Sequence, residues 1–164
     1  MSYSACETNW ADHRDTDKLE AFVSGKKTHG FGCAWCHGAP GIGLGRLRIR
    51  ELLGTTLLDS KLHDAATATH KHLGGRNAGL CHGEYGLLAF LEAYYNTFTN
   101  TQDKPTGEVT CMADTRLTQK FTESAGTRQF LGKIGFMNGL CGVGYSIIRR
   151  QHRMALPDIL TLSM

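Results

Sequence analysis

Two segments of the chain begin with the same three residues. They read Cys36-His37-Gly38-Ala39-Pro40-Gly41-Ile42 and Cys81-His82-Gly83-Glu84-Tyr85-Gly86-Leu87. Each segment pairs a thiol with an imidazole, continues with two glycines in a Gly-x-x-Gly spacing, and runs into an apolar stretch. A third segment, residues 137–144, keeps this spacing at Gly139 and Gly142 but lacks the Cys-His pair. We therefore expect three copies of one structural repeat, each with a helix that begins at its glycines.

The first repeat has the pattern of a helical hairpin. Apolar residues follow Pro40 at helical spacing, and Gly54 can end this helix. Thr55 or Thr56 can then cap a second helix that ends at Gly74-Gly75. The apolar positions are Ile42, Leu44, Leu47, Ile49, Leu52 and Leu53 in the first helix, and Leu58, Leu62, Ala65, Ala66 and Leu73 in the second.

The rest of the chain continues the helical pattern. A helix is expected after Gly83, followed by a polar loop over residues 97–107, a further helix over residues 109–121, and the third repeat helix around residues 143–148. No segment alternates for long between polar and apolar residues. Repeated helical hairpins with glycines at their helix starts predict an all-α protein, a partial α/α toroid whose helix starts crowd around a central axis.

The composition is that of a globular protein. The chain has 164 residues, of which 41% are hydrophobic and 20% charged, and its net charge is +3. This length suits one domain, and the small charge does not indicate a nucleic-acid partner. The first residues lack the features of a secretion signal, and no apolar run is long enough to span a membrane. We expect a cytoplasmic protein whose six cysteines are mostly reduced.

The Cys-His-Gly segments and their surroundings resemble a known family. Residues 35–44 and 80–83 are similar to the first and second zinc motifs of lanthionine cyclases, the LanC-like proteins. Residues 139–145, with Arg149 and residues 157–160, resemble the C-terminal end of the cyclase half of class II lanthipeptide (lantibiotic) synthetases, the LanM type. Asn9-Trp10-Ala11-Asp12 resembles a Trp-Pro-Asp segment of the same enzymes.

The resemblance has consequences for fold and extent. It implies an α/α barrel of the LanC-like kind. Cyclase domains of this family are much longer than 164 residues. Residues 1–164 are therefore expected to form the C-terminal part of a lanthionine cyclase domain, with another chain supplying the missing cyclase half.

Cys36, Cys81 and His82 are the candidate metal ligands. Thiolate and imidazole are the ligands that zinc prefers, and three protein ligands leave the fourth tetrahedral position open, as in catalytic zinc sites. The spacing alone leaves an alternative open, in which the cysteines are small buried side chains and the histidine caps a helix. The matched family motifs imply a Zn²⁺ site made by these three residues.

The resemblance also implies a reaction. A cysteine thiolate of a dehydrated precursor peptide takes the open zinc position and adds to dehydroalanine or dehydrobutyrine, which closes a thioether ring. The α-carbon must then be protonated by a general acid. His37 stands where the family has a His or Tyr that faces the reaction centre, so it is a candidate catalytic residue. Because it is adjacent to Cys36, we do not expect it to bind the same metal, and a histidine simply packed at a helix start is the alternative.

Other interpretations of function stay open. The chain can be a non-catalytic zinc-binding remnant or a split subunit. Cys33-Ala34-Trp35-Cys36-His37 also matches the C-x-x-C-H pattern of c-type haem attachment and the C-x-x-C of redox proteins. The haem interpretation is disfavoured because no export signal is present and because it leaves the second Cys-His-Gly segment unexplained. Cys33 is not an expected ligand, and Cys6, Cys111 and Cys141 are expected to be free thiols.

Overall fold

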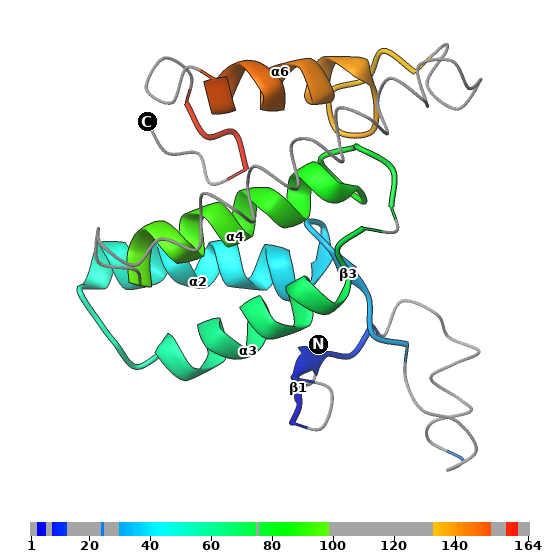
Figure 1. Ribbon diagram of the computed structural model, residues 1–164. Coiled ribbons are helices and arrows are strands. Elements are labelled where there is room, and N and C mark those ends of the chain that lie inside the picture. Colours follow the sequence, from blue (N-terminus) through cyan, green and yellow to red (C-terminus); the bar gives the residue numbers. More distant parts are fainter. Residues whose placement is uncertain are drawn as a thin grey trace.

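The fold is mainly helical, with two small sheets. The computed structural model describes residues 3–5, 8–12, 24, 30–74, 76–98, 133–151 and 157–160. These residues form the helices α2 (Ala39–Leu53), α3 (Asp59–Lys71), α4 (Glu84–Phe98) and α6 (Leu140–Gln151) (Figure 1). Strands β1 (Tyr3–Ser4) and β2 (Asn9–Trp10) pair antiparallel, as do β3 (Cys33–Ala34) and β4 (His37–Gly38). The expected helical class is confirmed, whereas the short strands were not expected.

Helix α2 begins and ends where its sequence predicts. Pro40 lies in the first turn, and Gly54 caps the C-terminus with a left-handed φ of 60°. Helix α3 begins at Asp59 rather than directly after the threonines, because the threonines form the turn before it. The Leu57 N–H donates to Thr55 Oγ1 at 3.3 Å, and the Asp59 N–H donates to the Thr56 carbonyl at 3.0 Å.

The two later helices also lie at their expected places. Helix α4 follows Gly83 but runs to Phe98, so Thr97 belongs to the helix and not to the expected loop. Helix α6 contains the expected third repeat helix. The rest of the loop over residues 97–107, the helix expected over residues 109–121, and Cys6 and Cys111 lie outside the described residues. No helix among the described residues is both long enough and apolar enough to cross a membrane.

The second glycine of each repeat packs against the same backbone feature. A Cβ atom built on Gly41, Gly86 or Gly142 would lie 1.8, 2.0 or 1.8 Å from a carbonyl oxygen. In each case this oxygen belongs to the residue six positions earlier, which is Trp35, Leu80 or Phe136. The preceding segment therefore folds back onto the first turn of the helix, and only glycine leaves room for it. The three repeats inferred from sequence are thus repeats of structure.

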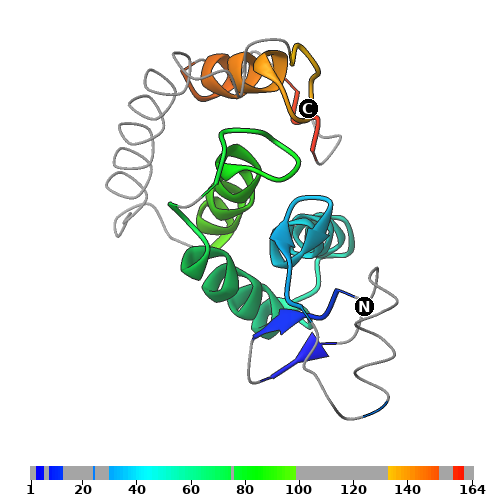
Figure 2. The same cartoon turned by 90° about the vertical axis from the view of Figure 1, so that its right-hand side faces the viewer.

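The core lies between α2, α3 and α4. Its most buried large side chains include Leu44 of α2, Leu62 of α3 and Phe90 of α4. Gly43 allows close approach of α2 and α4, because a Cβ there would lie 2.3 Å from the Phe90 ring. Helix α6 lies on the side of α4 away from α3 (Figure 2), and an Arg150–Glu92 ion pair of 2.8 Å joins α6 to α4.

The apolar stripe of α2 is buried only in its first half. Leu44 and Leu47 are buried, but Ile49 is 45% exposed, Leu52 66% and Leu53 72%. Leu57, in the turn that follows, is 88% exposed. The C-terminal end of α2 therefore presents large apolar side chains at the surface of the described residues.

Candidate metal centre

The β3–β4 hairpin presents Cys36 at the surface. Cys33 pairs with Gly38 and Ala34 with His37, which leaves Trp35 and Cys36 as the two residues of the turn. The Cys36 side chain is exposed at this turn. Gly38 has a φ of 95°, which favours glycine, and directly precedes α2. The order Cys-His-Gly-Ala-Pro therefore places an exposed thiol one turn before a helix.

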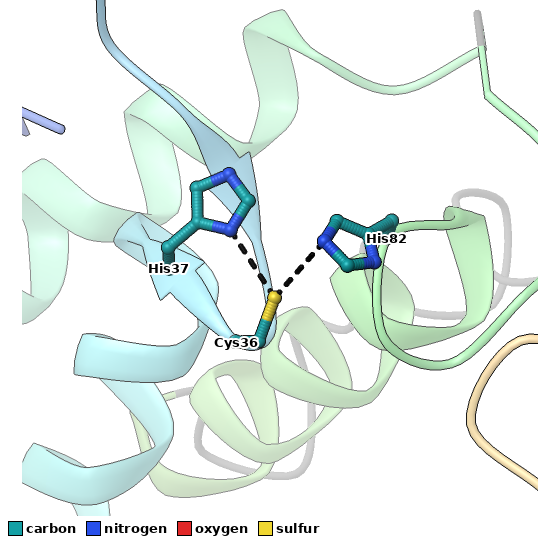
Figure 3. A group of neighbouring side chains, drawn as sticks. All are labelled: Cys36, His37 and His82. Carbon is teal, nitrogen blue, oxygen red and sulfur yellow. Dashed lines mark hydrogen bonds between the residues drawn. The ribbon is translucent and has the colours of Figure 1, made fainter. Parts of the chain in front are cut away.

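His82 brings the second repeat to this thiol. It lies in the segment that precedes α4, and its Nε2 atom is 3.2 Å from Cys36 Sγ (Figure 3). The Nδ1 atom of His37 approaches the same sulfur at 3.1 Å. The ligand atoms of Cys36, His37 and His82 all lie within 4.8 Å of one another, so they form a cluster that could hold a metal ion.

His37 reaches this cluster although it is adjacent to Cys36. It is the first residue of β4, and its ring packs over Gly32, where a Cβ would lie 2.2 Å from His37 Cδ2. The ring centroids of His37 and His82 are 5.4 Å apart, and the two rings are tilted by 54°. The hairpin turn thus lets both neighbours, the thiol of Cys36 and the ring of His37, face one point.

Cys81 occupies the place in the second repeat that Cys36 occupies in the first. The Trp35 N–H donates to the Cys81 carbonyl at 3.0 Å, so the two motif segments lie side by side. Cys81 is 9% exposed. Its thiol is not a member of the three-residue cluster that the described part of the chain forms. The side chains of Cys36 and His82 are therefore in direct contact. Cys81 is linked to the first segment by its backbone carbonyl, and it directly precedes His82 in the chain.

Two residues from the N-terminal segment, Asn9 of β2 and Asp12, which follows this strand, contact the residues around the cluster. The side chain of Asn9, which is 1% exposed, donates from Nδ2 to the Gly32 carbonyl at 3.2 Å. Asp12 Oδ2 lies 3.8 Å from His37 Nε2, on the ring edge that does not face Cys36. Sequence reasoning gave these two residues no role of their own. Their presence in the family-like segment Asn9-Trp10-Ala11-Asp12 was the signal that could have found them.

Cys33 has the environment of a structural cysteine. It is fully buried, its Sγ contacts the Ala68 carbonyl at 4.0 Å, and burial raises the pKa of its thiol to about 11. A thiol that stays protonated and inaccessible is a poor redox nucleophile. Covalent haem attachment would need both thiols of the C-x-x-C-H segment to be accessible, and only Cys36 is.

An open cleft leads to the cluster. It has a volume of about 520 Å³ and is lined by Cys36 and Trp35 together with residues of α2 and Leu160. Arg48 is the charged residue of this lining, and it pairs with Glu51 at 2.6 Å. The Cys36 thiol is therefore accessible from solvent along this cleft.

Comparison with known proteins identifies the family. The family model described as lanthionine synthetase C-like protein matches residues 2–161, which is nearly the whole chain. Comparison with curated proteins and with solved structures gave no match. The matched range includes both Cys-His-Gly segments, the supporting β1–β2 hairpin and helix α6. The chain therefore belongs to the lanthionine synthetase C-like family.

Proposed function

We propose that the protein is a zinc-dependent lanthionine cyclase fragment of the LanM type. It would add cysteine thiolates of a dehydrated precursor peptide to dehydroalanine or dehydrobutyrine and so form thioether rings. The observation that carries this proposal is the 3.2 Å approach of Cys36 Sγ to His82 Nε2. It joins two side chains of zinc-binding type that come from the Cys-His-Gly segments of two repeats.

The donor set fits zinc. The cluster offers one sulfur and two imidazole nitrogens within 4.8 Å, and such ligands suit Zn²⁺ better than Mg²⁺ or Ca²⁺, which prefer oxygen. We propose Cys36, Cys81 and His82 as the ligands. Cys81 is supported by its matching motif and by its position beside His82. His37 is then not a ligand and can take part in the reaction.

The metal supplies one function, which is to favour the thiolate of an incoming substrate cysteine at neutral pH. The remaining requirements fall on side chains. The new C–S bond forms at the β-carbon, the carbon–carbon double bond is lost, and the α-carbon must gain one proton. His37 is the proposed donor. It is supported by its place 3.1 Å from Cys36, and by Asp12 at 3.8 Å, which puts a counter-charge beside a protonated ring.

We further propose that residues 1–164 act as the C-terminal part of a cyclase domain. Another chain would supply the remaining half and bind against this one in the cytoplasm, where thiols stay reduced. The exposed Leu52, Leu53 and Leu57 support this proposal, because exposed apolar groups of this size commonly mark an interaction surface. A zinc-binding remnant without catalysis, or a split subunit, is the alternative.

The test combines metal content with ring closure. The purified chain should bind about one zinc ion, and Cys36→Ala, Cys81→Ala and His82→Ala should each abolish binding. Cys141→Ala is the matched control, because it removes another exposed thiol, in α6. A pre-dehydrated peptide, with the other cyclase half added, should lose its alkylatable thiol without any change of mass.

The variants also separate the proposed function from its alternatives. His37→Ala should slow ring closure while zinc stays bound. If the reconstituted pair binds zinc but closes no ring, the result would favour the alternative, a non-catalytic zinc-binding remnant. Full activity of Cys81→Ala would refute the proposed ligand set, and full activity of Cys36→Ala would refute the mechanism itself.

A further inference from the structure

The third repeat binds to the second as the second binds to the first. The Trp35 N–H donates to the Cys81 carbonyl at 3.0 Å, and at the equivalent place the Leu80 N–H donates to the Met137 carbonyl at 3.0 Å. The Cys81 N–H adds a bond of 2.9 Å to the same Met137 carbonyl. The segment that carries Cys81 and His82 is thus held on one side by the first repeat and on the other by the third.

Asn138 stands in the third repeat where the other repeats have His37 and His82. The Gly-x-x-Gly spacing aligns Phe136-Met137-Asn138-Gly139 with Leu80-Cys81-His82-Gly83. The Oδ1 atom of Asn138 lies 3.5 Å from Nδ1 of His82. The other ring nitrogen of His82, Nε2, is the one that faces Cys36 Sγ at 3.2 Å. The His82 ring therefore lies between the thiol and an amide group.

This arrangement selects a tautomer. An amide oxygen can only accept, so a hydrogen bond between these two atoms requires the proton on Nδ1 of His82. A proton on Nδ1 leaves Nε2 with a lone pair that points toward Cys36. Nε2 needs this lone pair to bind a metal ion. Histidine ligands in metal sites are commonly held in this way by an acceptor on their second ring nitrogen.

We propose that the third repeat, which lacks the Cys-His pair, serves the centre as its support, and that Asn138 is a positioning residue that fixes the tautomer and orientation of His82. The inference rests on the proposed zinc site. It gives a reason why Met137 and Asn138 stand where the other repeats have a Cys-His pair. The Met137 carbonyl holds the backbone of the Cys81 segment, and the Asn138 amide holds the ring.

The test compares three substitutions at Asn138. Asn138→Leu keeps the size of the side chain but has no acceptor, and Asn138→Ala removes the side chain. Both should weaken zinc affinity, measured by competition with a chelator, by about 10- to 100-fold. Asn138→Asp keeps an acceptor oxygen and should bind zinc nearly as the original chain does. Asn96→Leu, an exposed position on α4, is the control and should leave affinity unchanged.

The tautomer is read independently of the metal. Two-bond ¹H–¹⁵N NMR spectra of the metal-free chain should show the His82 proton on Nδ1, with His82→Gln used to assign the signals. Asn138→Leu should give a mixture of tautomers. A proton on Nε2 in the original chain, or equal affinity losses for Asn138→Leu and Asn138→Asp, would overturn the positioning role.

The two proposals fail in different ways. If the original chain binds zinc and Asn138→Leu binds it equally well, the positioning role is refuted and the proposed function survives. If the original chain binds no zinc, both are refuted.

Discussion

Replacing Gly41 by alanine tests the carbonyl contact that defines the repeat. The added Cβ would lie 1.8 Å from the Trp35 carbonyl oxygen, and this oxygen belongs to the backbone, so no side-chain rotation can relieve the clash. Overpacking of this kind costs about 1–3 kcal/mol. Alanine's better helix propensity returns at most about 1 kcal/mol. We expect Gly41→Ala to lower the free energy of unfolding by about 1–2 kcal/mol.

The same helix contains a matched control. Gly45 is exposed, and a Cβ there would meet no atom within 4 Å. Gly45→Ala should therefore stabilise the protein, by up to about 1 kcal/mol. Helix α6 repeats the comparison, because Gly142 would meet the Phe136 carbonyl oxygen at 1.8 Å whereas Gly144 meets nothing within 4 Å.

The assay is guanidinium unfolding followed by far-ultraviolet circular dichroism, with the four alanine variants measured side by side. Gly41→Ala and Gly142→Ala should unfold at lower denaturant concentration than the original chain, and Gly45→Ala and Gly144→Ala at equal or higher concentration. Because Trp35 neighbours Cys36 in the hairpin turn, Gly41→Ala should also weaken zinc binding. Equal stabilities of Gly41→Ala and Gly45→Ala would refute the packing argument.

Three further outcomes follow from burial and exposure. Cys33 should react with iodoacetamide at neutral pH far more slowly than the exposed Cys141, because burial raises its pKa to about 11; equal rates in the folded chain would contradict its buried position. Burial lowers the pKa of His70 below its unfolded value, so its contribution to stability is full above the unfolded pKa and is lost as pH falls through the folded pKa. His70→Gln should reduce this loss, which unfolding curves at several pH values would detect, and an unchanged pH dependence would argue against it. The isolated chain should self-associate in light scattering, and Leu52→Gln with Leu53→Gln should reduce this; a monodisperse original chain would count against the exposed apolar end of α2 as an interaction surface.

The helices could be predicted from sequence because their signals are local. Pro40 near the start of α2 and Gly54 at its end are visible within the segment itself. The strands could not be predicted, because each has two residues and no alternation can develop over that length. The start of α3 was misplaced because Thr55 and Thr56 stabilise a turn as readily as they cap a helix.

The Cys-His cluster was partly predictable for a similar reason. The repeated motif identified both Cys36 and His82 as candidate ligands, and the structure places their side chains in contact. Asp12 and Asn138 reach the centre only through tertiary contacts, with β4 and with the second repeat, which a single sequence does not display. Adjacency to Cys36 suggested that His37 would not bind the same metal, but the tight turn before β4 directs its ring toward Cys36. The proposed ligands Cys81 and His82 are neighbours as well, so the proposal itself allows adjacent residues to share a metal ion.

Zinc K-edge X-ray absorption of the zinc-loaded chain tests the proposed centre most directly. The proposed ligands Cys36, Cys81 and His82 predict two sulfur atoms at about 2.3 Å and one imidazole nitrogen at about 2.0 Å, with a fourth light atom from solvent. Cys81→Ser should lower the sulfur count to one. One sulfur with two imidazole nitrogens in the original chain would show that His37, and not Cys81, is the third ligand. A spectrum without sulfur, or a chain that takes up no zinc, would contradict the zinc centre altogether.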